Sequence, residues 1–110
     1  MLLAEKWAQE HQAAGPKFVS CHPGWVSTPA VDAAYGDQKK YLEPMRSPWQ
    51  GAEGIAWLMS TESANIKSGE FYLDRKVREK HIGGFFSKST KNTEAEVTEM
   101  LSEMKKITNI

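Results

Sequence analysis

One feature of the sequence limits the fold of this chain more than any other. It is the order in which a helical pattern, a short apolar run and a second helix start follow one another. The apolar run covers residues 17–22 and is closed by Pro23 and Gly24. The helical pattern before it ends at Gly15 and Pro16. A short apolar segment between such turn residues is typical of a buried strand in a parallel sheet. Helix, tight loop and strand form half of a βαβ unit, so we predict an α/β fold.

The first helix is expected to run from Leu2 to about Ala14, with Leu3, Trp7 and Ala8 on one face. It has no capping signal, because no Ser, Thr, Asp or Asn precedes Leu2. We therefore expect the helix to continue an element that extends further upstream.

A second helix start follows the apolar run. Ser27 and Thr28 stand before Pro29, and a hydroxyl can cap free backbone amides while proline at the first helical position has no amide to satisfy. A short helix is predicted over residues 30–35. Residues 36–45 are polar, which predicts an irregular loop or a weak helix.

A third helix should begin at a capping box. Ser47 supplies the cap, Pro48 takes the first helical position and Gln50 stands three residues after the serine. The helix is predicted to end near Ser60. Its expected core face consists of Ala52, Ile55, Ala56 and Met59.

The remainder of the chain predicts one more strand and one more helix. The strand covers residues 69–74, and residues 75–92 form a charged connection of low order. The last helix runs to about Thr108 from a capping box made by Thr93 and Glu96, and we expect it to pack on the domain body. Its apolar stripe consists of Val97, Met100, Leu101, Met104 and Ile107.

Composition narrows the function classes. Fourteen Lys plus Arg balance fourteen Asp plus Glu, so charge indicates neither nucleic acid nor an acidic membrane as a partner. No apolar stretch is long enough to span a membrane. The single cysteine, Cys21, favours a reducing compartment, so we expect a cytoplasmic protein with Cys21 as a small buried hydrophobic residue. His11, His22 and His81 are too scattered to predict a metal site.

The segment after the first predicted strand carries the most specific motif. Pro23, Gly24, Val26 and Thr28 spell Pro-Gly-x-Val-x-Thr, which resembles an element of the short-chain dehydrogenases/reductases. In that family the element closes over the nicotinamide half of NAD or NADP. The resemblance therefore implies that these four residues are cofactor-binding, through the backbone after Pro-Gly and the Thr hydroxyl.

Two later segments strengthen the resemblance. The family has a helix that begins Ser/Thr-Pro-x-x-Gly-Ala and then a Ser/Thr-Gly-x-Phe/Tyr strand, and this chain has them at residues 47–52 and 68–71. Residues 22–25 and 74–76 are similar to the retinol-dehydrogenase-like branch of the family. Three elements in the family's order are hard to obtain by chance.

The resemblance covers residues 1 to about 76. It implies the C-terminal part of a Rossmann-type doubly wound parallel sheet, with its last two strands and their flanking helices. Residues 77–92 are then a polar connection and residues 93–110 an added C-terminal amphipathic helix. The strand at residues 17–22 would normally pair with a further central strand, so we expect an exposed sheet edge and self-association through it.

No residue of this chain is predicted to be catalytic. In the family the Gly-rich phosphate turn and the catalytic Ser with Tyr-x-x-x-Lys precede the Pro-Gly strand. The chain spells Tyr-x-x-x-Lys from Tyr35 to Lys39 and from Tyr72 to Lys76. Both matches follow Pro-Gly, the first is broken by Gly36 and the second lies in a predicted strand, so we reject both.

Three hypotheses about function remain. The first is a fragment or truncated form of an NAD(P)-dependent oxidoreductase that acts on a small-molecule carbonyl or alcohol, inactive alone and without tight cofactor binding. The second is a non-catalytic interaction protein that pairs with a full-length relative or another partner. The third is that the sequence starts at an internal methionine of a longer protein. Thr28 as a simple helix cap also stays open. Trp25 could line a substrate pocket in the intact fold or could be a core residue.

Overall fold

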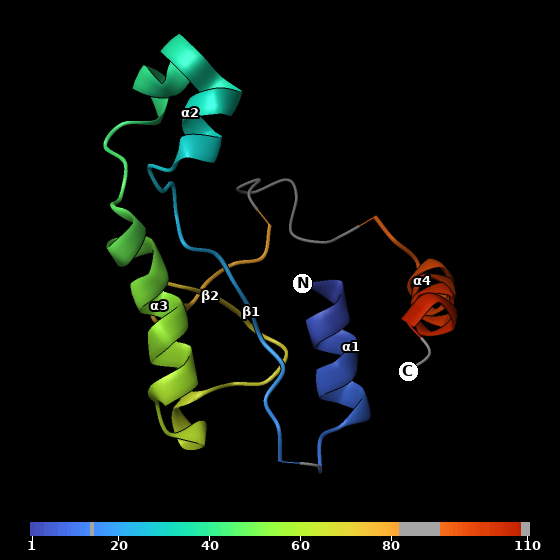
Figure 1. Ribbon diagram of the computed structural model, residues 1–110. Helices are drawn as coiled ribbons and strands as arrows, with labels where there is room; N and C mark the ends of the chain where they lie inside the picture. Colours follow the sequence, from blue (N-terminus) through green and yellow to red (C-terminus); the bar gives the residue numbers. More distant parts are fainter. Residues whose placement is uncertain (14, 82–90, 109–110) are drawn as a thin grey trace.

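The computed structural model describes residues 1–13, 15–81 and 91–108 (Figure 1). Its α-helices are α1 (Leu2–Glu10), α2 (Pro29–Tyr35), α3 (Pro48–Ser60) and α4 (Glu94–Thr108). Its strands are β1 (Ser20–Cys21), β2 (Phe71–Leu73) and β3 (Lys76–Val77). Two 3-10 helices are η1 (Gly36–Leu42) and η2 (Ser63–Asn65). The predicted α/β class is confirmed.

The strands form one sheet in the order β1-β2-β3. β1 and β2 are parallel, with Ser20 opposite Phe71. Backbone bonds extend this pairing beyond the assigned strands, since Gly69 N donates to Phe18 O at 2.6 Å and His22 N donates to Tyr72 O at 3.0 Å. The predicted parallel pair is confirmed.

The third strand, β3, lies within residues 75–92, where a charged connection of low order was predicted. It pairs with β2 in antiparallel register across a two-residue turn. The turn residues Asp74 and Arg75 have φ values of 55° and 62°. Two-residue hairpins of this hand usually contain Gly or Asn, and the absence of such a signal is why the sequence did not predict the hairpin.

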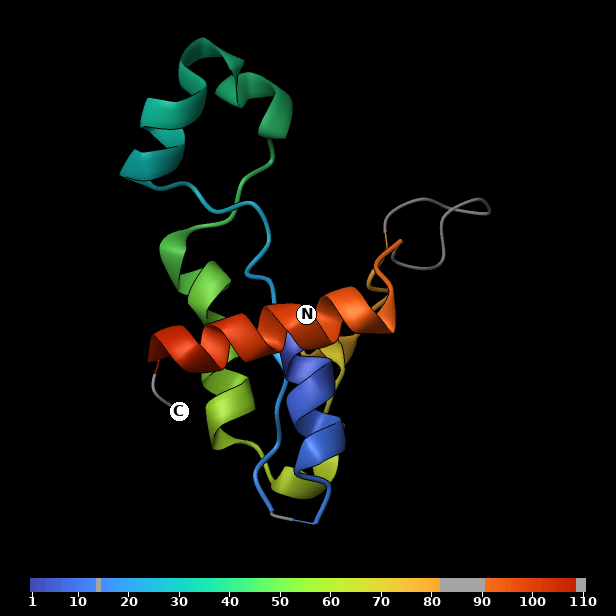
Figure 2. The same ribbon diagram turned by 90° about the vertical axis from the view of Figure 1, so that its right-hand side faces the viewer.

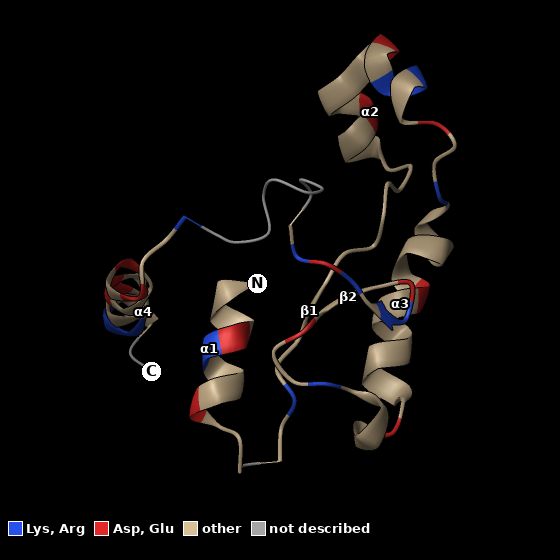
Figure 3. Ribbon diagram, turned by 180° about the vertical axis from the view of Figure 1, so that it is seen from behind, with Lys and Arg blue, Asp and Glu red and all other residues tan. Residues whose placement is uncertain are grey.

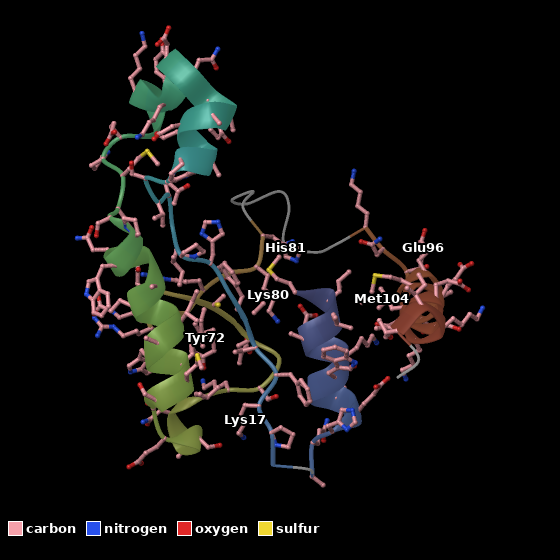
Figure 4. All side chains as sticks on the ribbon, viewed as in Figure 1. Lys17, Tyr72, Lys80, His81, Glu96 and Met104 are labelled. Atoms are coloured by element: carbon pink, nitrogen blue, oxygen red, sulfur yellow. The ribbon has the colours of Figure 1, made fainter. Side chains whose placement is uncertain are left out.

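Helices cover both faces of the β1–β2 pair, with α3 on one side and α1 on the other (Figure 1). Tyr72 is 3% exposed and lies between β2 and α3, with its ring centroid 6.3 Å from that of Trp57 (Figure 4). On the other face the rings of Trp7 and Phe18 are 5.7 Å apart. The α1 face predicted to be apolar therefore packs on the strand that follows it.

Helix α3 has the predicted bounds but not the predicted inner face. Ala52, Ile55, Ala56 and Met59 were expected in the core, and all four are exposed, with Met59 at 85%. The helix instead turns its buried Gly51 and half-buried Trp57 toward the rest of the chain. Small residues allow close approach of helix backbone to its neighbours, so the apolar stripe does not identify the packed face here.

Helix α4 crosses α1 on its outer side (Figure 2). Val97 and Leu101 are 5% and 8% exposed, and Lys6 and Lys105 form ion pairs with Glu94 and Glu10. Packing on the body is thus confirmed, and so is the Thr93–Glu96 capping box. The rest of the predicted stripe is not covered, since Met100, Met104 and Ile107 are 37%, 36% and 81% exposed.

Two further expectations were wrong. Helix α1 ends at Glu10, with His11 N bonded to Trp7 O, rather than near residue 14, which lies outside the described residues. Cys21 is exposed rather than buried. In β1, half-buried Ser20 stands beside exposed Cys21, and the two side chains point to opposite faces of the sheet.

The capping box of α3 is expected to contribute measurably to stability. Ser47 Oγ accepts from Gln50 N at 3.2 Å and Gln50 Oε1 accepts from Ser47 N at 2.9 Å. Ser47→Ala removes one partner and should lower the free energy of unfolding by about 1 kcal/mol. Urea unfolding of the variant measures the change. Ser60→Ala at the other end of α3 is the control and should have little effect, because Ser60 Oγ donates only to exposed helix carbonyls.

Candidate functional site

The candidate site lies where β1 and β2 end. In open α/β sheets, ligands bind outside the carboxyl ends of the strands. The loop of residues 22–28 follows β1 there, and Asp74 follows β2. Because β1 and β2 are parallel, both segments reach the same edge of the sheet. The four residues predicted to bind a cofactor all belong to this loop.

Pro23 and Gly24 make the turn out of β1. Gly24 has a φ of 81°, and its amide donates to His22 Nδ1 at 2.9 Å. A Cβ atom at Gly24 would lie 2.7 Å from Arg46 Nε. Glycine is therefore required here by the left-handed backbone and also by the guanidinium packed against it.

The backbone of Val26 is turned outward by a parallel bridge to Arg46. Arg46 N donates to Trp25 O at 2.8 Å, and Ser27 N donates to Arg46 O at 2.9 Å. In a parallel bridge the central residue directs its own amide and carbonyl away from the partner. Val26 thus presents one donor and one acceptor on the side opposite Arg46.

The Val26 side chain meets α3 at Gly51. A Cβ atom built on Gly51 would lie 2.4 Å from Val26 Cγ2. No real pair of carbon atoms approaches so closely without displacement, so only glycine lets the helix lie against the loop. This contact sets how close the loop lies to α3 at Val26.

Thr28 ends the loop as the cap of α2. Its Oγ1 accepts from Val31 N at 3.3 Å, so the interpretation of Thr28 as a helix cap is confirmed. Lys39 from η1 donates to Ser27 Oγ at 2.9 Å and pairs with Asp32 at 2.5 Å. The α2 and η1 segments, which extend away from the sheet (Figure 1), are tied to the loop by this lysine.

Arg46 joins the loop to the β2–β3 hairpin. Its Nη1 and Nη2 donate to Asp74 Oδ1 and Oδ2 at 2.5 and 2.9 Å, and Nη1 also donates to Pro23 O at 3.2 Å. The hydrogen bonds from Arg46 hold the pKa of the Asp74 carboxyl below its ordinary value, and Arg75 and Arg78 add to the effect. The same bonds raise the pKa of the Arg46 guanidinium.

The sign of this pKa shift sets when the ion pair contributes to stability. The pKa of Asp74 is lower in the folded than in the unfolded chain. The contribution is therefore fully present above the unfolded pKa and is lost as pH falls through the folded pKa. At neutral pH the pair is charged and intact.

Trp25 is not a core residue. It is 51% exposed and its ring meets that of Tyr35 edge-on at 5.9 Å. Tyr35 itself is 40% exposed. The pair leaves aromatic surface exposed at the loop of residues 22–28 and the end of α2.

Neither rejected Tyr-x-x-x-Lys match has a reactive geometry. Tyr72 lies in β2 as expected, is buried, and its hydroxyl accepts from Lys67 N at 2.8 Å. Tyr35 is the last residue of α2, and Lys39 lies in η1, where it binds Asp32. The two lysines of these matches therefore do not share a helix face with their tyrosines.

Arg46 and Asp74 are the site residues that sequence reasoning missed. Arg46 stands directly before the Ser47-Pro48 helix start, and Asp74 ends the second predicted strand. In the sequence these two residues give only a weak signal of an ion pair, because they are 28 positions apart. Only the parallel arrangement of the sheet brings them together.

Charge distribution, metal-binding clusters and membrane-spanning helices are the features of the described residues that bear on other classes of site. Lys and Arg side chains are interspersed with Asp and Glu over the ribbon (Figure 3). Across residues 1–13, 15–81 and 91–108, no cluster of three or more His, Cys, Asp or Glu has the geometry to hold a metal ion. Within the same ranges, no helix is long and apolar enough to cross a membrane.

Two curated proteins resemble the chain. Dehydrogenase/reductase SDR family member 12 of Homo sapiens is 36% identical over 106 residues, which cover 94% of this chain and 33% of the human protein. The Bos taurus protein of the same name is 34% identical over 106 residues, again 94% of this chain and 33% of its own length. The chain thus spans about a third of the length of the curated relatives it matches. No family model and no solved structure matched it.

Proposed function

We propose that this chain forms the nicotinamide-side part of an NAD(P)-dependent oxidoreductase, because 94% of it is similar to two proteins called dehydrogenase/reductase SDR family member 12. The substrate class is a small-molecule carbonyl or alcohol. The observation that carries the proposal is the outward-turned backbone of Val26 beside the Pro23-Gly24 turn. The single cysteine favours the cytoplasm as its compartment.

The residues of the loop fit a nicotinamide carboxamide. That group carries one carbonyl acceptor and an amide donor, and Val26 offers a backbone donor and a backbone acceptor on one side. Thr28 Oγ1 accepts one bond from Val31 N and keeps its own hydroxyl proton as a donor. When bound, the nicotinamide supplies the hydride acceptor or donor, and this chain contributes its orientation.

Residues 1–110 by themselves are proposed to bind the cofactor weakly and to turn over nothing. The loop supplies contacts to one end of a dinucleotide, and the two Tyr-x-x-x-Lys matches in the chain have no reactive geometry. NADPH binding by these residues alone is expected to be no tighter than millimolar. A micromolar dissociation constant by fluorescence titration contradicts this part of the proposal.

Cofactor binding is tested on the natural protein that carries this sequence, with NADPH and NADH titrated separately. Thr28→Asn keeps a good helix cap and loses the hydroxyl, so it should weaken the preferred cofactor about three- to tenfold, as expected for one hydrogen bond. Thr28→Ser keeps both roles and is the matched control. If the unmodified protein binds neither cofactor, the proposed function is wrong.

A second candidate function is non-catalytic association. In the described part of the chain, β1 has β2 on one side and no strand on the other. A strand edge of this kind can pair with another chain. Light scattering of the purified protein over a range of concentrations tests it: a constant monomer mass contradicts association through this edge.

A further inference from the structure

The loop of residues 22–28 has few anchors of its own. Within it, His22 Nδ1 accepts from Gly24 N, and Thr28 caps the helix that follows. At its first residue, His22 N donates to Tyr72 O of β2 at 3.0 Å. From Pro23 to Ser27, Arg46 binds Pro23 O, Trp25 O and Ser27 N at 3.2, 2.8 and 2.9 Å. These three contacts fall on alternate loop residues, so Arg46 determines which side of the loop faces outward.

Arg46 is in turn fixed by the sheet. The Asp74 carboxylate accepts hydrogen bonds from both terminal nitrogens of the Arg46 guanidinium, at 2.5 and 2.9 Å. Asp74 follows directly after β2, whose central Tyr72 is 3% exposed, and its φ of 55° is set by the hairpin to β3. The loop is therefore linked to β2 through the Asp74 carboxylate and the Arg46 guanidinium.

The contacts demand the shape of arginine. The planar guanidinium gives two parallel bonds to Asp74, a third to Pro23 O, and packs flat where a Cβ atom on Gly24 would meet it. Lysine offers one nitrogen, which cannot make the two-pronged contact with the carboxylate and reach the loop carbonyl in the same geometry.

We propose that Arg46 is a positioning residue which, held by Asp74, sets the orientation of the Val26 backbone and thereby the affinity of the site for a nicotinamide cofactor. The inference rests on the proposed function for the identity of the ligand. The clamp itself, defined as Arg46 with Asp74, is a property of this chain that does not depend on that ligand.

The test uses the natural protein that carries this sequence, with the variants Asp74→Asn and Arg46→Lys. Hydrogen exchange of peptides covering residues 22–28 should become faster in both variants. The dissociation constant for the preferred cofactor should rise about tenfold, as expected when one charge-assisted hydrogen bond is lost. The cofactor KM should rise with it while kcat at saturating cofactor changes less than twofold, because no reacting group has been altered.

The matched control is Glu53→Gln. It removes the ion pair between Glu53 of α3 and Arg75 of the hairpin (3.3 Å), which joins the hairpin to α3 and not to the loop. Exchange in residues 22–28 and the cofactor KM should stay at the values of the unmodified protein. A merely structural effect of the hairpin would lower the folded fraction, and thus kcat, in all three variants without changing KM.

The outcomes separate the two proposals. Unchanged exchange in Asp74→Asn and Arg46→Lys, or an equal change in Glu53→Gln, overturns the clamp. Faster exchange in a protein that binds neither NADPH nor NADH supports the clamp and refutes the cofactor. Faster exchange with unaltered cofactor affinity overturns the positioning role.

Discussion

Leu101→Ala is expected to lower the free energy of unfolding by about 2–4 kcal/mol and to release α4 from the body of the chain. Leu101 is 8% exposed and is, with Val97, a buried residue of α4, the helix that crosses α1 (Figure 2). The ion pairs of Lys6 with Glu94 and of Lys105 with Glu10 are solvent-accessible and contribute little by themselves. Removing the Leu101 side chain therefore removes much of the buried apolar contact that holds α4 on the body of the chain.

The loss should be visible both globally and locally. Urea unfolding followed by circular dichroism gives the change in free energy, and limited proteolysis shows whether cleavage near α4 becomes faster. Ile107→Ala on the same helix is the control, because Ile107 is 81% exposed and its change should stay within about 0.5 kcal/mol. Equal effects of the two substitutions would contradict the packing of α4 on α1.

Gly51→Ala is expected to destabilise the protein by about 1–3 kcal/mol, although alanine ordinarily favours a helix over glycine. The added methyl group would lie 2.4 Å from Val26 Cγ2, so either α3 or the loop must move. Displacement of Val26 also moves the backbone groups proposed to meet the cofactor. Cofactor affinity should therefore fall together with stability.

Gly54→Ala separates the steric effect from helix propensity. It lies three residues further along α3, and a Cβ atom there has no heavy atom within 4 Å. This variant should be stabilised by about 0.5–1 kcal/mol, opposite in sign to Gly51→Ala. Adding Val26→Ala to Gly51→Ala should recover part of the lost stability in thermal unfolding. The same sign at both glycines would show that α3 does not pack on the loop through Gly51.

Local signals in the sequence predicted the beginnings of elements well. Thr28, Ser47 and Thr93 all cap helices as expected, since a cap needs only a side-chain oxygen and a backbone amide two or three residues away. The Pro23-Gly24 turn and the parallel pairing of two short strands were likewise predicted. The resemblance to the short-chain dehydrogenases/reductases rests on the same short motifs, and both curated proteins that the chain matches are named as members of that family.

Predictions that depended on a partner far along the chain were less successful. The apolar stripe of Ile55 and Met59 on α3 was assigned to the core and is exposed. Cys21 was expected to be buried and is exposed. Periodicity shows that a helix has an apolar face, but not whether another element covers that face.

The sequence by itself therefore determined the α/β class, the order of the four α-helices and the first two strands, and the loop on which the candidate site is built, because caps, turns and strand patterns act over a few residues. The tertiary structure decided that α3 packs through Gly51 rather than through its apolar stripe. It also decided that Arg46 and Asp74 meet at the loop. Both features are contacts between segments far apart in the sequence, Gly51 with Val26 and Arg46 with Asp74, which no local pattern encodes.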